Sequence, residues 1–239
     1  MVCISQVLGK DRLEAMIKKI CAIVPAHNEE KNIAAVIKGI QKNSADTIVI
    51  DDGSTDATYK LAQAGGAVVI RHQRKKGKGA SLKDGLDYAI ANGYDYIMTI
   101  DADGQHSPEE MPLFLAAAEK CEKTGIVIGN RLHRPEGMPL VRLCTNRFMS
   151  YLISLICRQS IPDTQCGYRL IKKEVLKAIT IKTNKFEVES EMLIKAARAH
   201  FLIDSVPIKS IYAGEKSRIN PFLDTLRFVR FLIKTTIHK

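Results

Sequence analysis

Short apolar runs alternate with longer segments of helical periodicity along residues 20–129. Five of these runs are rich in β-branched or aromatic residues, which suit buried strands. We therefore predict strands at Cys21–Val24, Thr47–Ile50, Ala67–Ile70, Tyr96–Ile100 and Ile126–Ile128. Helices are predicted between them, at Lys31–Gln41, Thr55–Ala64, Ala80–Ala91 and Pro108–Lys120. Strands that alternate with helices form a mainly parallel sheet flanked by helices, so we expect an α/β fold.

The pattern changes after residue 129. A long helix is predicted from Leu140 to about Arg158, followed by a short strand near Gly167–Ile171. A further helix is then expected near Val188–His200. Two short strands at Leu202–Val206 and Ile208–Ile211 and a last helix from Pro221 to about Ile237 complete the prediction.

The two ends of the chain stand outside this pattern. Residues 1–19 predict an additional amphipathic helix around Leu13, Met16 and Ile17. We therefore divide the chain into an N-terminal extension (1–19), a main domain (20–212) and a C-terminal amphipathic helix (213–239). No composition break argues for a second large domain.

Two carboxylates one residue apart, Asp101 and Asp103, follow the strand predicted to end at Ile100. Ser107 and Pro108 then have the character of a helix start, which places the two acids on a loop at the carboxyl end of a strand. Open α/β sheets bind ligands at that edge. Such a pair is either an ordinary turn or cap, or a site for a hard divalent cation that bridges to a diphosphate.

Two other predicted strands also end in polar loops. The segment from Asp51 to Asp56 follows one of them, and the segment from Pro25 to Glu30 follows another. Because the carboxyl ends of parallel strands meet at one edge, three such loops favour a binding site over a coincidence of turns.

These segments together resemble the family 2 inverting glycosyltransferases, which have a GT-A fold, and within them the dolichyl- or polyprenyl-phosphate mannose and glucose synthases. Six segments carry the resemblance in chain order, at residues 24–29, 51–56, 76–80, 101–106, 129–131 and 163–169. Each motif alone is modest, but their order and spacing as a set are specific. The resemblance implies a Rossmann-like, mostly parallel sheet with a nucleotide half followed by an acceptor half.

The resemblance implies a donor site for a nucleotide-sugar, GDP- or UDP-linked. Asp101, Asp103 and Gln105 would hold Mg²⁺ or Mn²⁺ against the diphosphate, an assignment that suits a hard ion with oxygen ligands. Asp52 would bind the base, although a helix-capping role remains open for it. The residues implied to line the rest of the donor site are Pro25, Ala26, Glu29 and Lys78.

The acceptor site is implied around three arginines and one acid. Arg131 and Arg147 would bind phosphate, and Asp163 and Arg169 belong to a turn near the acceptor, where Arg169 could equally be a framework residue. A phosphate acceptor arrives ionised and needs only this positive charge.

A hydroxyl acceptor would instead need a general base. The candidates are Asp163, Glu189 and Glu191. The two glutamates, however, also suit the N-terminus of a helix.

Composition limits the possible partners. The chain has 239 residues and a net charge of +10, which admits nucleic acid, anionic lipid and phosphorylated small molecules as partners. Its six cysteines show neither zinc-site nor disulfide spacing, so we expect reduced thiols. No signal peptide and no run long enough to span a bilayer is evident. The last predicted helix carries an apolar stripe beside basic residues, typical either of a helix at an anionic membrane surface or of an ordinary packed helix.

We therefore expect a metal-dependent hexosyltransferase that acts on polyprenyl or dolichyl phosphate, peripherally bound at the cytoplasmic face of the membrane. One alternative keeps the fold and uses a glycan or glycolipid hydroxyl as acceptor. A nucleotidyltransferase is disfavoured because the first strand is not followed by a glycine-rich loop with a basic residue. A basic nucleic-acid-binding module is disfavoured because aromatic residues are not interleaved with the charges and Trp is absent.

Overall fold

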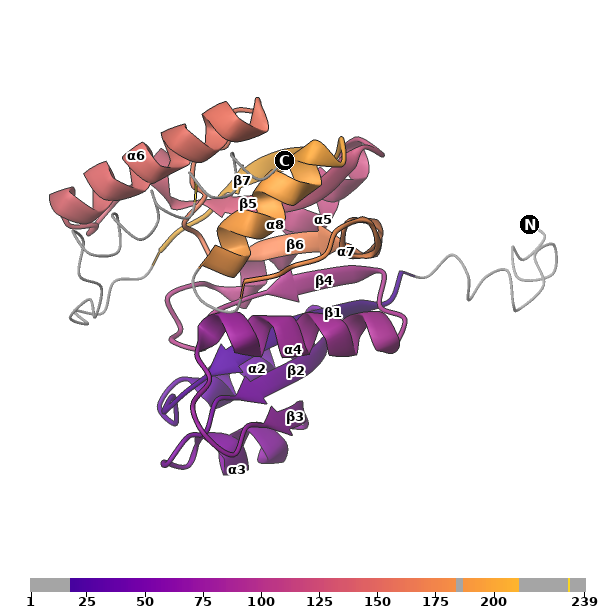
Figure 1. Cartoon of the computed structure of the whole chain (residues 1–239). Coiled ribbons are helices and arrows are strands. Elements are labelled where there is room, and N and C mark those ends of the chain that lie inside the picture. Colours follow the sequence, from indigo (N-terminus) through magenta and orange to yellow (C-terminus); the bar gives the residue numbers. More distant parts are fainter. Residues whose placement is uncertain (1–17, 184–186, 211–231, 233–239) are drawn as a thin grey trace, which may run out of the picture.

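The computed structural model describes residues 18–183, 187–210 and 232. Within these residues, one seven-stranded sheet has the order β3-β2-β1-β4-β6-β5-β7 (Figure 1). The strands are β1 (Ile20–Ala26), β2 (Asp46–Asp51), β3 (Val68–Arg71), β4 (Tyr96–Thr99), β5 (Thr124–Asn130), β6 (Arg169–Lys172) and β7 (Leu202–Pro207). Strand β6 runs antiparallel to both its neighbours, whereas all other pairs are parallel. The carboxyl ends of the parallel strands and the beginning of β6 therefore lie at the same edge.

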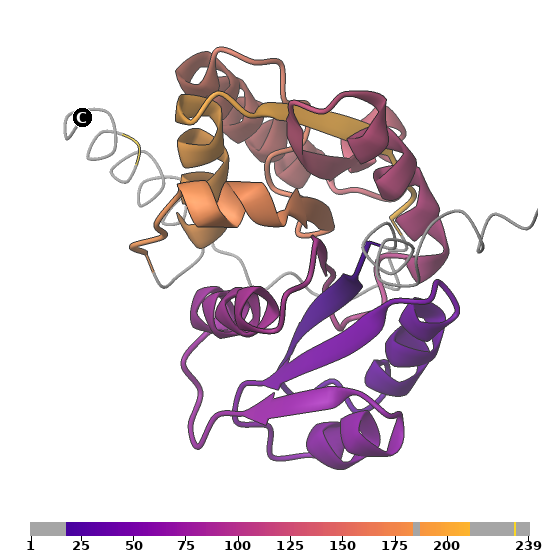
Figure 2. The ribbon, with the colours of Figure 1, turned by 90° about the vertical axis from the view of Figure 1, so that its right-hand side faces the viewer.

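Helices cover both faces of the sheet. Figure 2 shows α2, α3 and α5 on one face and α4, α7 and α8 on the other. Their bounds are α2 (Ile33–Gln41), α3 (Thr58–Ala64), α4 (Lys78–Ala91), α5 (Met111–Lys120), α6 (Leu140–Cys157), α7 (Lys173–Ala178) and α8 (Glu187–Arg198). The 3₁₀ turn η2 (Pro108–Glu110) follows the polar loop after β4, and the 3₁₀ turn η3 (Arg131–His133) directly follows β5.

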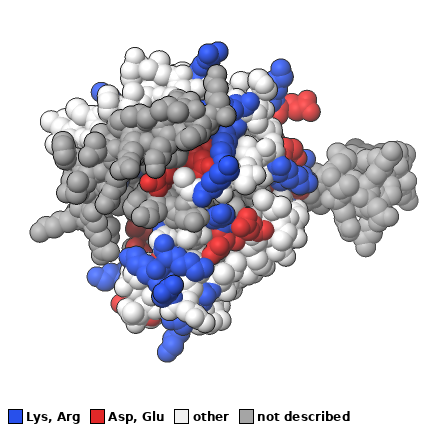
Figure 3. Space-filling view, in the orientation of Figure 1, with Lys and Arg blue, Asp and Glu red and all other residues white. Residues whose placement is uncertain are grey.

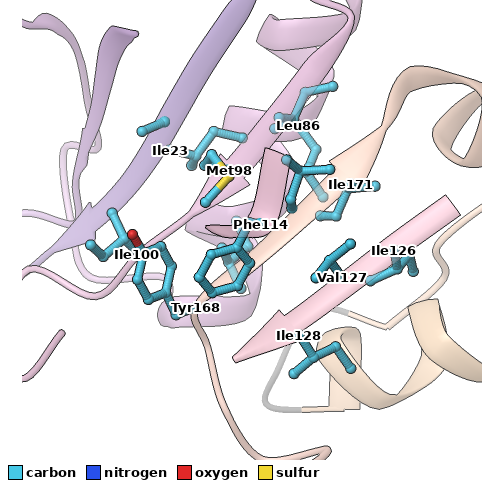
Figure 4. Close-up of a cluster of buried hydrophobic side chains, with 14 of the residues drawn as sticks. Ile23, Leu86, Met98, Ile100, Phe114, Ile126, Val127, Ile128, Tyr168 and Ile171 are labelled. Atoms are coloured by element: carbon cyan, nitrogen blue, oxygen red, sulfur yellow. The ribbon is translucent and has the colours of Figure 1, made fainter. Parts of the chain in front are cut away.

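The core lies between the sheet and these helices. Apolar side chains from strands of both halves of the sheet meet there, as Figure 4 shows for Ile23, Met98 and Ile171. Phe114 of α5 packs against Tyr168, with ring centroids 4.4 Å apart. Because Tyr168 immediately precedes β6, this packing fixes the start of that strand beside the polar edge.

The predicted α/β fold is confirmed, and all five strands and four helices predicted for the first half are present. The second predicted helix begins three residues later than expected, at Thr58. Asp56 Oδ1 accepts hydrogen bonds from the Thr58 N–H and Oγ1, so the residues before Thr58 form a turn. In the second half, the long helix, the strand after it and the helix near residue 188 are confirmed.

Two details of the second half were predicted wrongly. Helix α7 was not predicted, since its six residues are too few for a clear period. No strand forms over the described residues 208–210, where we predicted one at Ile208–Ile211. The predicted helices of the N-terminal extension and of residues 221–237 lie outside the described residues, apart from Leu232, which is helical and buried in the core.

Candidate active site

The polar loops converge at one edge of the sheet, as the sequence predicted. Strands β1 and β2 end in register, with Ala26 opposite Asp51, and β4 adjoins β1 on its other side. The Thr99 hydroxyl at the end of β4 donates to the Gly167 carbonyl at 2.7 Å and so joins this edge to the turn before β6. The chain therefore brings three strand ends and this turn together around one site.

The loop after β4 presents oxygen ligands in a tight turn. Asp103 Oδ1 accepts from the Gln105 N–H at 3.0 Å, and Gly104 adopts a positive φ of 73° that favours glycine. Asp101, Asp103 and Gln105 are all half-buried. The three predicted metal-binding residues therefore belong to one short turn, and each is partly exposed to solvent.

A lysine from α4 lies against this acidic loop. Lys78 Nζ is 2.7 Å from Asp101 Oδ1 and 3.5 Å from Glu189 Oε1 of α8. Burial by itself would raise the pKa of Asp101, but the Lys78 ammonium outweighs it and holds that pKa below 3.8. Burial would lower the pKa of Lys78, but the two carboxylates raise it well above 10.5. The site thus holds an ionised carboxylate beside a charged ammonium group.

Gly167 makes room for this pair. A Cβ at that position would lie 2.8 Å from Asp101 Oδ2 and 2.9 Å from Lys78 Nζ. Any larger residue would displace one of these charged groups.

His106 is a site residue that the sequence analysis quoted within a motif but did not assign. It is 3% exposed, and its ring lies 5.5 Å from that of Tyr168. Burial lowers its pKa to about 4, so the imidazole is neutral at physiological pH. Its position directly after Gln105 was the signal that could have singled it out.

The residues fit a divalent metal. The side chains are oxygen donors at half-buried positions, and Mg²⁺ is commonly bound by one or two carboxylates together with substrate phosphates. No group of three or more His, Cys, Asp or Glu side chains placed to hold a metal ion occurs among the described residues, so other oxygen ligands would have to complete the coordination shell. Asp101, Asp103 and Gln105 are therefore suited to an ion that arrives with, or is completed by, a diphosphate.

Asp52 anchors the basic loop before α4. Its carboxylate accepts from the Lys76 N–H at 2.7 Å and the Gly77 N–H at 2.8 Å, and His72 Nδ1 lies 2.8 Å away. Burial alone would raise the pKa of Asp52, but the hydrogen bonds from His72, Lys76 and Gly77 bring it below 3.8. Asp52 thus positions the loop that leads to Lys78, and its predicted contact with the donor base stays a prediction.

The exposed basic side chains of this loop gather at the N-terminal end of α4 (Figure 3). They are Arg74, Lys75 and Lys76, and Lys76 Nζ pairs with Asp84 at 3.1 Å.

A cavity of about 440 Å³ opens beside this loop. Its lining consists of Gly53, Ser54, Thr55, Arg71, His72 and Gln73. Arg71 Nε forms an ion pair with Asp51 Oδ2 at 3.0 Å, and the guanidinium lies over the Tyr59 ring, 4.4 Å from its centroid. The cavity lies where β2 and β3 end, and its lining was not predicted from sequence.

The predicted donor residues of β1 lie at the same edge. The Ala26 carbonyl accepts from the Asp52 N–H at 2.8 Å, which joins the ends of β1 and β2. Glu29 accepts from Asn32 Nδ2, and its own N–H donates to Thr58 Oγ1. Pro25, Ala26 and Glu29 do not line the described cavity, so their donor role remains a prediction.

Arg131 and Asp163 form a buried bidentate ion pair. Arg131 Nε is 2.8 Å from Asp163 Oδ2, a terminal nitrogen is 3.0 Å from Oδ1, and the Arg131 N–H also donates to Oδ2. The side chains are 4% and 0% exposed. A carboxylate held this way is poorly placed to remove a proton from an acceptor, which argues against Asp163 as a general base.

Arg169 and Glu191 are framework residues. The guanidinium of Arg169 donates to the carbonyls of Cys166, Thr164 and Glu189, and the residue is 1% exposed. The prediction that Arg169 binds acceptor phosphate therefore gives way to the framework alternative.

Glu191 accepts bonds from Lys182 and Thr183 and pairs with Lys195 at 2.6 Å. These partners exclude it as a free base. Of the three candidate bases, Glu189 alone faces the Lys78–Asp101 pair.

Arg147 lies on α6 and is exposed. The structure does not bring it into the cluster around Asp101. Its predicted contact with an acceptor phosphate stays a prediction.

The chain is similar to known proteins over most of its length. The sequence model described as glycosyl transferase family 2 matches residues 21–180. The chain is 33% identical over 218 residues to a UDP-N-acetylglucosamine–dolichyl-phosphate N-acetylglucosaminyltransferase of Methanococcus voltae, covering 82% of this chain and 86% of that protein. It is 29% identical over 205 residues to an undecaprenyl-phosphate mannosyltransferase of Micrococcus luteus, covering 80% and 82%.

The fold is also found among solved structures. Glucosyl-3-phosphoglycerate synthase of Mycobacterium tuberculosis, in complex with Mn²⁺, UDP and phosphoglyceric acid, matches with a TM-score of 0.69. The match has 22% identity and covers 92% of this chain and 78% of that chain.

Proposed function

Because this chain belongs to glycosyl transferase family 2, we propose that it transfers a hexose from a nucleotide diphosphate sugar to a polyprenyl phosphate, with inversion. The observation that carries the proposal is the Asp101-x-Asp103 loop with Lys78 beside it, at the carboxyl edge of the sheet. This arrangement supplies both an oxygen-ligand set and a positive charge for a departing diphosphate. The enzyme class is that of a glycosyltransferase; donor, metal and acceptor are the proposed parts.

The donor assignment rests on two neighbouring features. The cavity beside Gly53 and His72 is large enough for a nucleoside and lies next to the loop that Asp52 holds. Lys78 is the first residue of α4, whose N-terminal N–H groups also favour anions. A nucleoside in the cavity would direct its diphosphate toward Lys78 and Asp101.

Mg²⁺ or Mn²⁺ at Asp101, Asp103 and Gln105 would offset the charge that develops on the leaving diphosphate. The residues themselves would bind and orient the donor, and Lys78 would neutralise phosphate charge. The M. tuberculosis structure, a complex with Mn²⁺ and UDP, has the same fold, which supports a divalent metal and a nucleotide as ligands.

The acceptor assignment rests on the relatives and on the chemistry of the described bases. Both named relatives are transferases for a lipid phosphate, dolichyl or undecaprenyl. A phosphate oxygen is already ionised and attacks without a general base. This agrees with Asp163 and Glu191 being bound to Arg131 and Lys195.

The proposed reaction is a single displacement. An oxygen of the lipid phosphate forms a bond to the anomeric carbon while the bond from that carbon to the donor diphosphate breaks. The bonding electrons leave with the nucleoside diphosphate, and the sugar is attached through one phosphate with inverted configuration. Binding at the membrane, where such lipids reside, follows from the same proposal.

A hydroxyl acceptor is the second candidate, and Glu189 is the observation that favours it. Its Oε1 is buried without a hydrogen-bond partner in the described part of the chain, while it lies 3.5 Å from Lys78 Nζ. A glutamate at that place could accept the proton of a hydroxyl acceptor.

A panel of donors and acceptors tests the proposal. Purified protein receives UDP-N-acetylglucosamine, UDP-glucose or GDP-mannose with Mn²⁺ or Mg²⁺, and either a short polyprenyl phosphate or a glycan. We expect a sugar–lipid product with one of the donors and none on the glycan. Transfer to a hydroxyl acceptor alone would reject the proposal, and loss of that activity in Glu189→Gln would then identify the base.

The matched pair of variants is Asp103→Ala and Glu109→Ala, because Glu109 is exposed and belongs to the neighbouring turn. A metal ion stabilises the leaving group in the transition state by several kcal/mol. Losing it would raise the activation free energy by a similar amount, so Asp103→Ala should lower turnover about a hundredfold or more. Glu109→Ala should leave turnover unchanged. Normal turnover of Asp103→Ala would remove the metal assignment.

A further inference from the structure

Helix α6 exposes a continuous apolar face. Several large apolar side chains of this helix are between about half and three quarters exposed. They are Leu140 (77%), Val141 (64%), Phe148 (49%), Tyr151 (61%) and Leu155 (57%). Single exposed apolar residues are ordinary on a protein surface, but a row of them along one helix marks an interaction site.

The spacing places these residues on one side of the helix. Val141, Cys144, Phe148, Tyr151 and Leu155 are exposed and separated by three or four positions, so they form a single stripe. The stripe runs the full length of α6, which extends along one end of the molecule in Figure 1.

The opposite side of α6 is the side that packs. Asn146, Ser150, Ile153 and Cys157 are buried. The exposed stripe is therefore not the helix's own core face. Helix α6 is the one helix among the described residues that is long and apolar enough to span a membrane, yet 28% of it is buried in the protein. A helix already packed on one side is suited to lie on a membrane surface.

The charges beside the stripe identify its partner. Helix α6 contains no Asp or Glu, whereas it contains Arg142 and Arg147 and is followed by Arg158. Arg147 is exposed. Apolar residues next to basic ones are typical of helices that lie in the interface of an anionic membrane.

A second copy of the chain fits this face less well. In a symmetric dimer the same patch faces itself, so the arginines of one copy would approach those of the other. Paired helices usually place charges of both signs beside the apolar seam. An anionic lipid surface complements the arginines without such repulsion.

We propose that the exposed face of α6 docks the protein on an anionic lipid surface, with the helix lying in the membrane plane. The inference deepens the proposed function by naming the surface that would bring the site to a lipid acceptor. Ser150 Oγ accepts from the Thr164 N–H at 2.9 Å, and Ser154 Oγ accepts from the Ile161 N–H at 3.0 Å. These bonds tie α6 to the turn that carries Asp163, so the docked helix fixes the orientation of the site above the lipid.

Vesicle binding tests the docking face. Sedimentation with phosphatidylcholine vesicles, with and without phosphatidylglycerol, compares the wild-type chain with Phe148→Asp/Tyr151→Asp. Removing two apolar side chains from the interface should weaken binding to the anionic vesicles at least about tenfold. The control is Leu113→Asp, since Leu113 of α5 is 48% exposed and lies outside the stripe. The milder Phe148→Ser/Tyr151→Ser serves if the charged variant does not fold.

Several results would overturn the proposal. They are unchanged vesicle binding of the α6 variants, equal binding of the wild type to neutral and anionic vesicles, and a wild-type dimer in light scattering that the α6 variants convert to monomer. If Leu226→Asp loses vesicle binding while the α6 variants keep it, docking is assigned to the C-terminal residues instead.

A soluble short-chain polyprenyl phosphate separates this inference from the proposed function. The α6 variants should use that acceptor as the wild type does, while their transfer to a long-chain acceptor in vesicles falls. An equal loss of transfer activity with both acceptors would contradict docking, because it would show that the α6 substitutions impair the active site itself. If the wild type binds anionic vesicles through α6 but transfers sugar to neither acceptor, the proposed function fails and the docking face stands.

Discussion

Replacing Asp163 by Ala should destabilise the protein strongly, because the change leaves the buried guanidinium of Arg131 without its carboxylate. Asp163 accepts two hydrogen bonds from that guanidinium and one from the Arg131 N–H, and its side chain is fully buried. Removing one partner of a buried ion pair costs about 3–5 kcal/mol. In a domain of about this size each kcal/mol lowers Tm by about 2–4 °C, so we expect a decrease of about 6–20 °C.

Thermal and urea unfolding of Asp163→Ala, compared with Glu136→Ala at an exposed position, measure this effect. The double variant Arg131→Leu/Asp163→Leu should recover part of the loss, since it removes both charges. A catalytic base behaves differently, because its removal lowers turnover and leaves the fold stable. The framework role derived from the ion pair is refuted if Asp163→Ala loses turnover while its free energy of unfolding stays within about 1 kcal/mol of that of the control.

Three further predictions concern the edge of the sheet. Gly167→Ala should lower kcat/KM with little loss of Tm, because its Cβ would lie within 3 Å of Asp101 Oδ2 and Lys78 Nζ; steady-state kinetics with wild-type values would contradict this. Lys78→Met should bind Mn²⁺ in the absence of nucleotide about tenfold more tightly, by ~1.4 kcal/mol, because the variant removes the ammonium group that pairs with Asp101. Electron paramagnetic resonance of free Mn²⁺ measures this affinity, and weaker binding would count against the metal assignment. Asp52→Asn should be less stable at neutral pH. The folded pKa of Asp52 lies below its ordinary 3.8, so its contribution is complete above that value and is lost as pH falls through the folded pKa; urea midpoints of the variant should therefore change less between pH 5 and 3 than those of the wild type.

The position of the site could be predicted from the sequence because local patterns determine it. Short apolar runs specified the strands, and the acids of the loop at Asp101 and Asp103 directly follow one of them. Since parallel strands end at a common edge, the convergence of the loops followed from the predicted parallel direction of the strands. Only local pattern and topology were needed for these parts.

The roles of other charged residues could not be predicted because their partners are distant in sequence. Arg131 and Asp163 are 32 residues apart, and each alone resembled a phosphate ligand or a base. Glu191 accepts a hydrogen bond from the backbone N–H of Thr183, in the segment before α8, and no periodic sequence pattern predicts this contact. Arg169 bonds to two carbonyls of the turn before it and to one carbonyl of α8, and a sequence does not show which carbonyls lack partners.

Mass spectrometry of the lipid product tests the central claim most directly. Purified full-length protein is incubated with a nucleotide-sugar, Mn²⁺ and a polyprenyl phosphate. Transfer of the sugar alone predicts a sugar joined to the lipid through one phosphate, with release of the nucleoside diphosphate. A lipid diphosphate sugar with release of the nucleoside monophosphate, or a sugar on a hydroxyl acceptor only, would contradict the account.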